Sequence, residues 1–181
     1  MISLGMYRRL ILFVAASFAL GQVLLLTIGA RAQGEPSKGY VIGPNEGERL
    51  IQRGGNIFIK VDTSKGSKDL AMGTQQLLVG VGIPIHRHLH MDETFYVVDG
   101  TGTFILNDVP HPIQRGDSIF IPKNTWHGFQ NPDRELLLLW VAPPDLAAFF
   151  REFATQPGAT PVQRTKEQMN DIARKYGTEF R

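Results

Sequence analysis

The chain divides into three regions by its pattern of hydrophobic and polar positions. A mainly apolar run without charged residues covers residues 10–30, short strand-like segments fill residues 44–143, and amphipathic patterns with helical spacing follow residue 144. Alternation of apolar and polar residues is typical of half-buried strands, whereas apolar residues three and four apart are typical of helices. The pattern therefore predicts a leading apolar segment, then a set of strands, then a helical extension.

Short runs rich in β-branched and aromatic residues predict the strands, and turn residues separate them. The predicted strands cover residues 57–61, 72–81, 94–98, 103–106, 118–121 and 136–141. We expect the strands at 94–98 and 103–106 to form a hairpin across Asp99 to Gly102. Many short strands with closely spaced turns predict an all-β fold, an antiparallel barrel over residues 44–143.

Two helices are predicted after the strands. Residues 145–153 have helical periodicity, and Thr165 to Gln168 form a capping-box pattern that opens a second helix ending at Gly177. We expect this C-terminal helical extension, residues 144–181, to pack its apolar stripes on the outside of the barrel, with its aromatic side chains in the core.

The leading segment has the three regions of a secretory signal peptide. Two arginines precede the apolar run of residues 10–30, and Ala30-Arg31-Ala32 supplies a small-x-small cleavage pattern. Residues 1–32 are therefore predicted to be a signal peptide; because the apolar run is long enough to span a bilayer, an uncleaved membrane anchor is the alternative. Either interpretation predicts an exported protein, periplasmic or secreted, with a polar linker over residues 33–43.

Charge and cysteine content exclude several classes of function. Three arginines and no acidic residue lie within residues 1–32, so 16 basic residues stand against 17 acidic residues in the rest of the chain. Without a basic cluster, nucleic acid is not an expected partner. The sequence has no cysteine, which excludes disulfides, thiolate metal sites and a cysteine nucleophile.

The histidines form a candidate metal site. His86 and His88 are two positions apart, so their side chains project to the same face of a strand. Glu93 follows, and His127 comes after a further turn and strand. Three imidazoles and one carboxylate make a site of nitrogen and oxygen donors without sulfur. His90 has the same strand parity and is the alternative ligand, although we expect it beside the ligands or at the mouth of the site.

The predicted cofactor is one divalent transition metal. Four protein ligands on an ion that prefers six leave two positions for water, dioxygen or a substrate oxygen. Fe or Mn is favoured for oxygen chemistry, while Ni, Cu and Co fit the same donors. Zn also fits, but it favours four-coordination and would leave the site less open.

The spacing of these residues resembles the two motifs of the cupin superfamily. G-x5-H-x-H-x4-E-x6-G runs from Gly80 to Gly100, and G-x5-P-x-N-x2-H-x3-N runs from Gly116 to Asn131. The second motif departs at Asn124, where the family usually has Gly, but Asn tolerates the left-handed conformation better than other residues. The resemblance, over about residues 44–178, is to single-domain cupins similar to quercetin dioxygenases. It implies a jelly-roll barrel whose metal ligands are His86, His88, Glu93 and His127.

The resemblance also implies a function. Cupins similar to quercetin dioxygenases are metal-dependent dioxygenase-type oxidoreductases, and this chain is expected to act on a small phenolic or enolic substrate. In these enzymes the residue that matches Glu93 is thought to act as the catalytic base, which needs a dry pocket. Strand alternation places Phe95 and Val97 inward, and Phe129 shares the parity of the last ligand. With His90 at the mouth, these residues form the predicted substrate pocket.

Two other function classes stay open at the level of sequence. One is a non-oxidative cupin, such as an isomerase, cyclase or decarboxylase, acting on a small polar acid. The other is a non-catalytic module that binds a small molecule or the metal alone. The fold does not decide between them, because one barrel hosts many chemistries. Similar cupins often pair, so a homodimer is a further expectation.

Overall fold

The computed structural model describes residues 38–131 and 133–181. The predicted signal peptide or anchor over residues 1–32, and the first part of the linker, lie outside the described residues. Within the described ranges, no helix is both long enough and apolar enough to cross a membrane.

The described residues form mostly strands. In chain order these are β1 Glu48–Gln52, β2 Gly55–Val61, β3 Ala71–Leu77, β4 Ile83–His88, β5 Glu93–Asp99, β6 Thr101–Leu106, β7 Val109–Gln114, β8 Ser118–Ile121, β9 His127–Gln130, β10 Leu136–Ala142 and β11 Thr178–Phe180. The helices are α2 Asp145–Phe153 and α3 Lys166–Lys175, and a 3₁₀ turn, η1, covers Thr63–Lys65.

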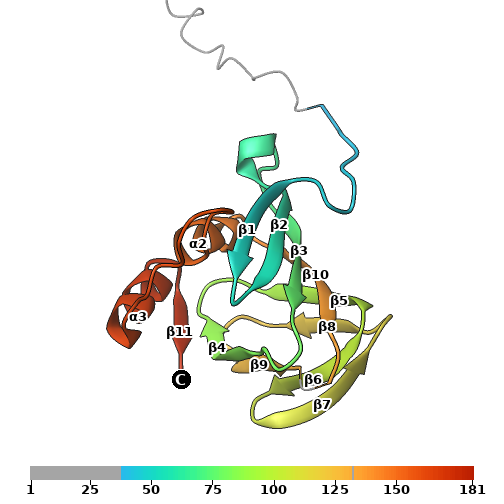
Figure 1. The fold of residues 1–181 in the computed structure, drawn as a ribbon, viewed down its shortest axis with the longest axis vertical. Helices are drawn as coiled ribbons and strands as arrows, with labels where there is room; N and C mark the ends of the chain where they lie inside the picture. The colour runs from blue at the N-terminus through green and yellow to red at the C-terminus, as the bar shows by residue number, and fades with distance from the viewer. Residues whose placement is uncertain (1–37, 132) are drawn as a thin grey trace, which may run out of the picture. The chain divides into compact units, whose positions relative to one another are not determined.

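The strands form two antiparallel sheets (Figure 1). One sheet has the order β1-β2-β3-β10-β5-β8, and the other has the order β11-β4-β9-β6-β7. Alternate residues of β10, from Leu136 to Ala142, are buried, as expected for strands with one face on a shared core. The predicted all-β jelly roll is confirmed, with short helices at its C-terminal end.

The predicted hairpin between residues 94–98 and 103–106 is wrong. β5 pairs with β8 and β10, whereas β6 pairs with β7 and β9 in the other sheet. The chain changes sheets at Gly100, whose φ is 91° and whose position would bring a Cβ within 2.0 Å of the Glu135 carbonyl oxygen. A Gly-rich turn between two strands looks the same in sequence whether the strands pair or part.

The predicted strand ranges leave out β1, β4, β7, β9 and β11. β7 contains Pro110 and Pro112 and lies at a sheet edge, where a missing N–H is tolerated. β1 buries only Leu50 fully, and β11 has three residues, so neither shows clear alternation. The predicted strand over residues 72–81 also ends early, at Leu77.

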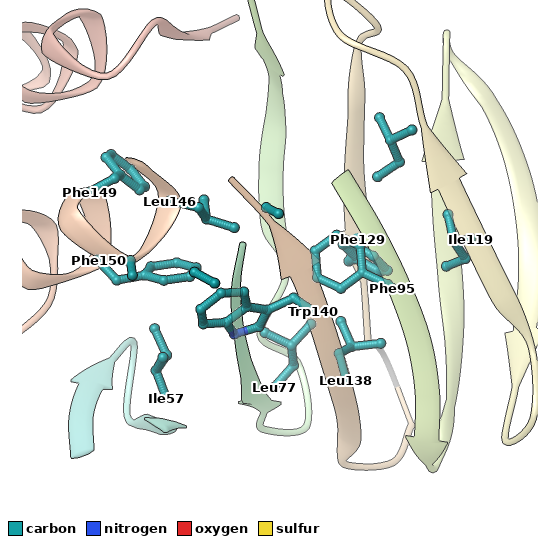
Figure 2. Packing of buried hydrophobic residues seen from close by; sticks show 14 of the residues in the cluster. Ile57, Leu77, Phe95, Ile119, Phe129, Leu138, Trp140, Leu146, Phe149 and Phe150 are labelled. Atoms are coloured by element: carbon teal, nitrogen blue, oxygen red, sulfur yellow. The ribbon is translucent and has the colours of Figure 1, made fainter. Parts of the chain in front are cut away.

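A continuous apolar core lies between the sheets and α2. The rings of Phe95 and Phe129 are 5.0 Å apart, and Trp140 lies 5.3 Å from Phe150 of α2 (Figure 2). Phe149 and Phe150 are buried, as predicted for the helical extension. Each such side chain contributes about 1.5–3 kcal/mol by burial. The predicted capping box is present at the start of α3, where Thr165 and Gln168 bond each other's backbone N–H.

Candidate metal centre

Three strands place the four candidate ligands together. His86 and His88 lie on β4, Glu93 begins β5, and His127 begins β9. His127 is the register partner of His86 across the β4–β9 pair, so their side chains lie on the same face. The exposed fractions are 8% for His86, 3% for His88, 3% for Glu93 and 0% for His127. The cluster therefore lies inside the barrel.

The ligand atoms have the separations that one ion requires. One donor atom from each of the four residues lies within 4.8 Å of all the others. Nε2 of His88 and Nε2 of His127 are each 3.3 Å from Oε2 of Glu93. Donors that stand about 2.1 Å from one ion are about 3 Å apart at a right angle and about 4.2 Å apart across the ion.

Backbone carbonyls fix two of the imidazoles. Nδ1 of His86 donates to the Pro84 carbonyl oxygen at 2.9 Å, and Nδ1 of His127 donates to the Thr125 carbonyl oxygen at 2.9 Å. A carbonyl can only accept, so the proton lies on Nδ1 and Nε2 presents a lone pair to the centre. This is the arrangement usual for a metal-ligating histidine.

The third imidazole is held by the C-terminal strand. β11 pairs with β4, and Thr178 is the register partner of His88. Nδ1 of His88 lies 2.9 Å from Oγ1 of Thr178, a side chain that is itself buried. The last residues of the chain therefore orient one of the ligands.

The donor atoms that face one another share no hydrogen bond. Among the described residues, Nε2 of His88, Oε2 of Glu93 and Nε2 of His127 are buried without a hydrogen-bond partner. A lone pair on each nitrogen directed at a carboxylate oxygen would be repulsive, and unpaired buried polar atoms are costly. A cation between them removes both costs, so these residues suit a divalent metal ion.

The electrostatics favour the protonation states that a metal needs. Burial holds the pKa of His86 well below its usual range, and the neighbouring His127 and His88 lower this pKa further. Burial raises the pKa of Glu93, but where His127 and His88 carry protons, their hydrogen bonds and positive charge outweigh burial and hold that pKa below its usual range. Neutral imidazole and ionised carboxylate are the ligand forms.

Asn124 stands where the second motif usually has Gly, and its backbone conformation explains why Asn is tolerated there. Asn124 adopts a left-handed conformation, with φ of 65°, and its N–H donates to the His88 carbonyl oxygen at 2.6 Å. Asn is the residue other than Gly that best tolerates this conformation. The turn therefore keeps its shape and ties the segment before His127 to β4.

Comparisons with known proteins agree with this arrangement. Residues 73–142 match the family model described as a cupin domain. The chain is 35% identical over 102 residues to Protein SchB of Streptomyces halstedii, an alignment that covers 52% of this chain and 74% of that protein. The chain belongs to the cupin superfamily.

Solved structures show the same cupin fold. The polyketide cyclase RemF from Streptomyces resistomycificus has a TM-score of 0.55 and 20% identity, covering 74% of this chain and 92% of that one. KdgF from Halomonas sp. has a TM-score of 0.53 and 21% identity, covering 59% and 94%. At these identities the likeness concerns the fold, and cupins of one fold carry many chemistries.

The residues predicted to line the substrate pocket of this cupin separate in the structure. Phe95 lines the cavity beside the metal ligands. Val97 and Phe129 are fully buried in the barrel core and do not line that cavity. Val97 stands four residues beyond Glu93 on β5, which is about 13 Å along a strand. His90 is exposed and lies outside the cavity, against Gly177.

Other residues of the cavity were not foreseen from the sequence. Gln52, Arg53 and Gln75 line it, and so do residues of α2 and Phe180 of β11. The β1–β2 turn carries the only sequence signal, the Gly54-Gly55 pair, which predicts a turn but not what the turn faces. The pairing of strands in the sheets decides which side chains line the cavity beside the candidate ligands.

Proposed function

We propose that this cupin is a metal-dependent oxidoreductase of the dioxygenase type that acts on a small phenolic or enolic substrate. The observation that carries the proposal is the buried cluster of three imidazoles and Glu93 beside a cavity with aromatic walls. Bound there, an Fe or Mn ion would supply Lewis acidity and redox capacity, with dioxygen as the oxidant.

The walls of the cavity suit a flat apolar molecule. Phe95, Phe149, Phe150, Phe153 and Phe180 line it together with the ligands. Phe180 stands 5.7 Å from the His86 ring and stacks on Phe153 at 6.0 Å. Aromatic side chains of this kind exclude water and hold a planar ring by its faces or edges.

Glu93 has the protonation state of a base. Its carboxylate would be ionised when it binds a metal ion, because that is the form that ligates. We propose that it binds the metal and accepts the proton of a substrate hydroxyl as that hydroxyl approaches the centre. A carboxylate is a weak base, so the transfer depends on the hydroxyl becoming more acidic beside a cation.

The polar residues that line the cavity favour a second candidate function, that of a non-oxidative cupin. Gln75 donates to Gln52 at 2.9 Å, and Arg53 lines the same cavity. Such groups are what a non-oxidative cupin would use to bind a small polar acid. This candidate differs from the first in consuming no dioxygen.

We also propose that the protein is exported. The basic start, the apolar run over residues 10–30 and the Ala-x-Ala pattern support a signal peptide or an anchor. Detection of the chain in a periplasmic or culture fraction, with the N-terminus at Gln33, would distinguish cleavage from anchoring.

Elemental analysis followed by oxygen uptake tests the proposed function. We expect about one transition-metal ion per chain and its loss in the His88→Ala, Glu93→Ala double variant. The matched control is His90→Ala, an exposed neighbour that should keep the metal. The metal-loaded protein should then consume dioxygen with flavonols or catechols. Conversion of a substrate without oxygen uptake would favour the non-oxidative candidate, and unchanged metal in the double variant would refute the metal site.

A further inference from the structure

The β1–β2 turn carries an arginine where the backbone disfavours one. Arg53 and Gly54 join the two strands, and both have positive φ, at 49° and 83°. A two-residue hairpin turn with both φ values positive prefers Asn-Gly or Gly-Gly, because a Cβ is strained there. A strained residue that persists at a cavity points to a use for its side chain.

The guanidinium lies at the rim of the metal cavity. Arg53 is exposed to solvent on one side and lines the cavity with His86, His88 and Glu93 on the other. Its Nη1 donates to the Gly82 carbonyl oxygen at 3.1 Å, just before the strand that carries the histidines. One N–H of the fork therefore anchors the group, and a guanidinium has further N–H groups to offer a ligand.

No carboxylate neutralises this cation. Among the described residues, arginines form several ion pairs with carboxylates, but Arg53 forms none of them. Inside the cavity, one Glu93 carboxylate against a divalent ion leaves a positive centre. Two positive groups thus flank a small space, which favours a ligand with more than one anionic or oxygen donor group.

The cavity also limits where such a ligand would lie. Its volume is about 30 Å³, and residues of α2, Phe180 and Arg53 are among those that line it. A space of this size holds about two water molecules, so a ring enters only if side chains at the rim move apart. Arg53 is the exposed residue of the lining, so its guanidinium would meet the outer end of the ligand.

We infer that Arg53 is a specificity-determining residue that binds a carboxylate on the substrate. The substrate class is a small arene or enol whose hydroxyl faces the metal ligands and whose carboxylate faces the rim. The aromatic walls hold the body of the ligand, and the guanidinium pairs with the carboxylate in a charge-assisted contact. This inference rests on the proposed function, because it needs a hydroxyl that binds at the metal.

Binding of two matched probes tests the inference. The protein is loaded with Co(II), whose visible spectrum changes when a ligand enters its coordination sphere, and is titrated with catechol and with protocatechuate, its ring carboxylate. We expect protocatechuate to bind about tenfold more tightly than catechol to the unaltered protein. In Arg53→Asn this preference should vanish while the dissociation constant for catechol changes less than about twofold.

Asn is chosen because it suits the turn. The melting temperature of Arg53→Asn should equal or exceed that of the unaltered protein, since Asn tolerates positive φ. Arg115→Asn, at an exposed arginine outside the metal cavity, is the matched control and should keep the tenfold preference.

The outcomes separate this inference from the proposed function. An equal preference in the unaltered protein and in Arg53→Asn overturns the inference and leaves the proposed function intact. A large fall in melting temperature assigns Arg53 to holding the hairpin through Gly82 and also overturns the inference. If neither probe changes the spectrum, the proposed function fails, and the role of Arg53 fails with it.

Discussion

At the scale of single residues, the metal centre depends on hydrogen bonds made behind the ligands. His86 and His127 donate to backbone carbonyls. A substitution at the acceptor residue changes its side chain but leaves this carbonyl in place. His88 instead depends on the hydroxyl of Thr178, near the end of the chain. This side chain is therefore the point at which a conservative change can loosen a ligand without removing it.

We expect Thr178→Val to weaken metal binding by about 10–100-fold, as is usual for loss of the group behind a ligating histidine. The side chain keeps its size but no longer accepts from Nδ1 of His88, which leaves a buried N–H unpaired. Competition with a chromogenic chelator measures the affinity. Thr178→Ser, which keeps the hydroxyl, should bind metal nearly as well as the unaltered protein, and equal affinities in both variants would contradict the positioning role.

At the scale of elements, the contact between β3 and β10 leaves no room for a side chain at Gly73. A Cβ there would stand 2.2 Å from the Phe58 carbonyl oxygen and 2.4 Å from Cζ2 of Trp140. We expect Gly73→Ala to lower the free energy of unfolding by about 1–3 kcal/mol, the usual cost of overpacking. Urea denaturation measures it, and Thr74→Ala on the other face should cost less than about 1 kcal/mol.

An ion-pair network joins α2 to the sheet. Arg151 donates to Glu48 at 2.8 Å and to the buried Asp62, which also accepts from Ser64. Burial raises the pKa of Asp62, but the hydrogen bonds from Ser64 and Arg151 outweigh it, so the pKa lies below its usual value. A lowered carboxylate pKa stabilises the fold above pH of about 4, and that stability is lost as pH falls through the lower folded-state value.

We expect Asp62→Asn to cost about 2 kcal/mol at neutral pH, because it breaks a buried charge-assisted hydrogen bond. The difference in melting temperature between the unaltered protein and the variant should shrink as pH falls from about 4 to 2, where the native carboxylate takes up its proton. Thermal melts across this range measure the difference. A gap that stays constant with pH would show that the charge of Asp62 has no part in holding α2.

At the scale of the whole molecule, binding of a metal ion at this cluster would be coupled to folding. The unfolded chain does not hold the four ligands together, so an ion that binds the folded barrel stabilises it by mass action. Free metal at about 100 times its dissociation constant adds about 2.7 kcal/mol, or about 5–10 °C in melting temperature for a chain of this size.

A chelator should therefore lower the melting temperature of the metal-loaded protein by about this amount. The His88→Ala, Glu93→Ala double variant should melt at the same temperature with and without chelator, and His90→Ala should respond as the unaltered protein does. Differential scanning calorimetry checks all three. An equal chelator effect in the double variant would place the metal elsewhere.

Features encoded by local spacing were determined by the sequence alone. The shared face of His86 and His88 and the capping box of α3 each depend on neighbours within a few positions, and the periodicities of strand and helix predict them. The left-handed turn at Asn124 follows from the same kind of local chemistry.

Only the tertiary structure decided which distant segments meet those ligands. The turn at Gly100 sends β5 and β6 into different sheets, although its composition also suits a hairpin. Register between β11 and β4 brings Thr178 to His88, and the packing of the β1–β2 turn brings Arg53 to the cavity. Such placements depend on many weak interactions between strands that are far apart in the chain, so a short stretch of sequence does not predict them.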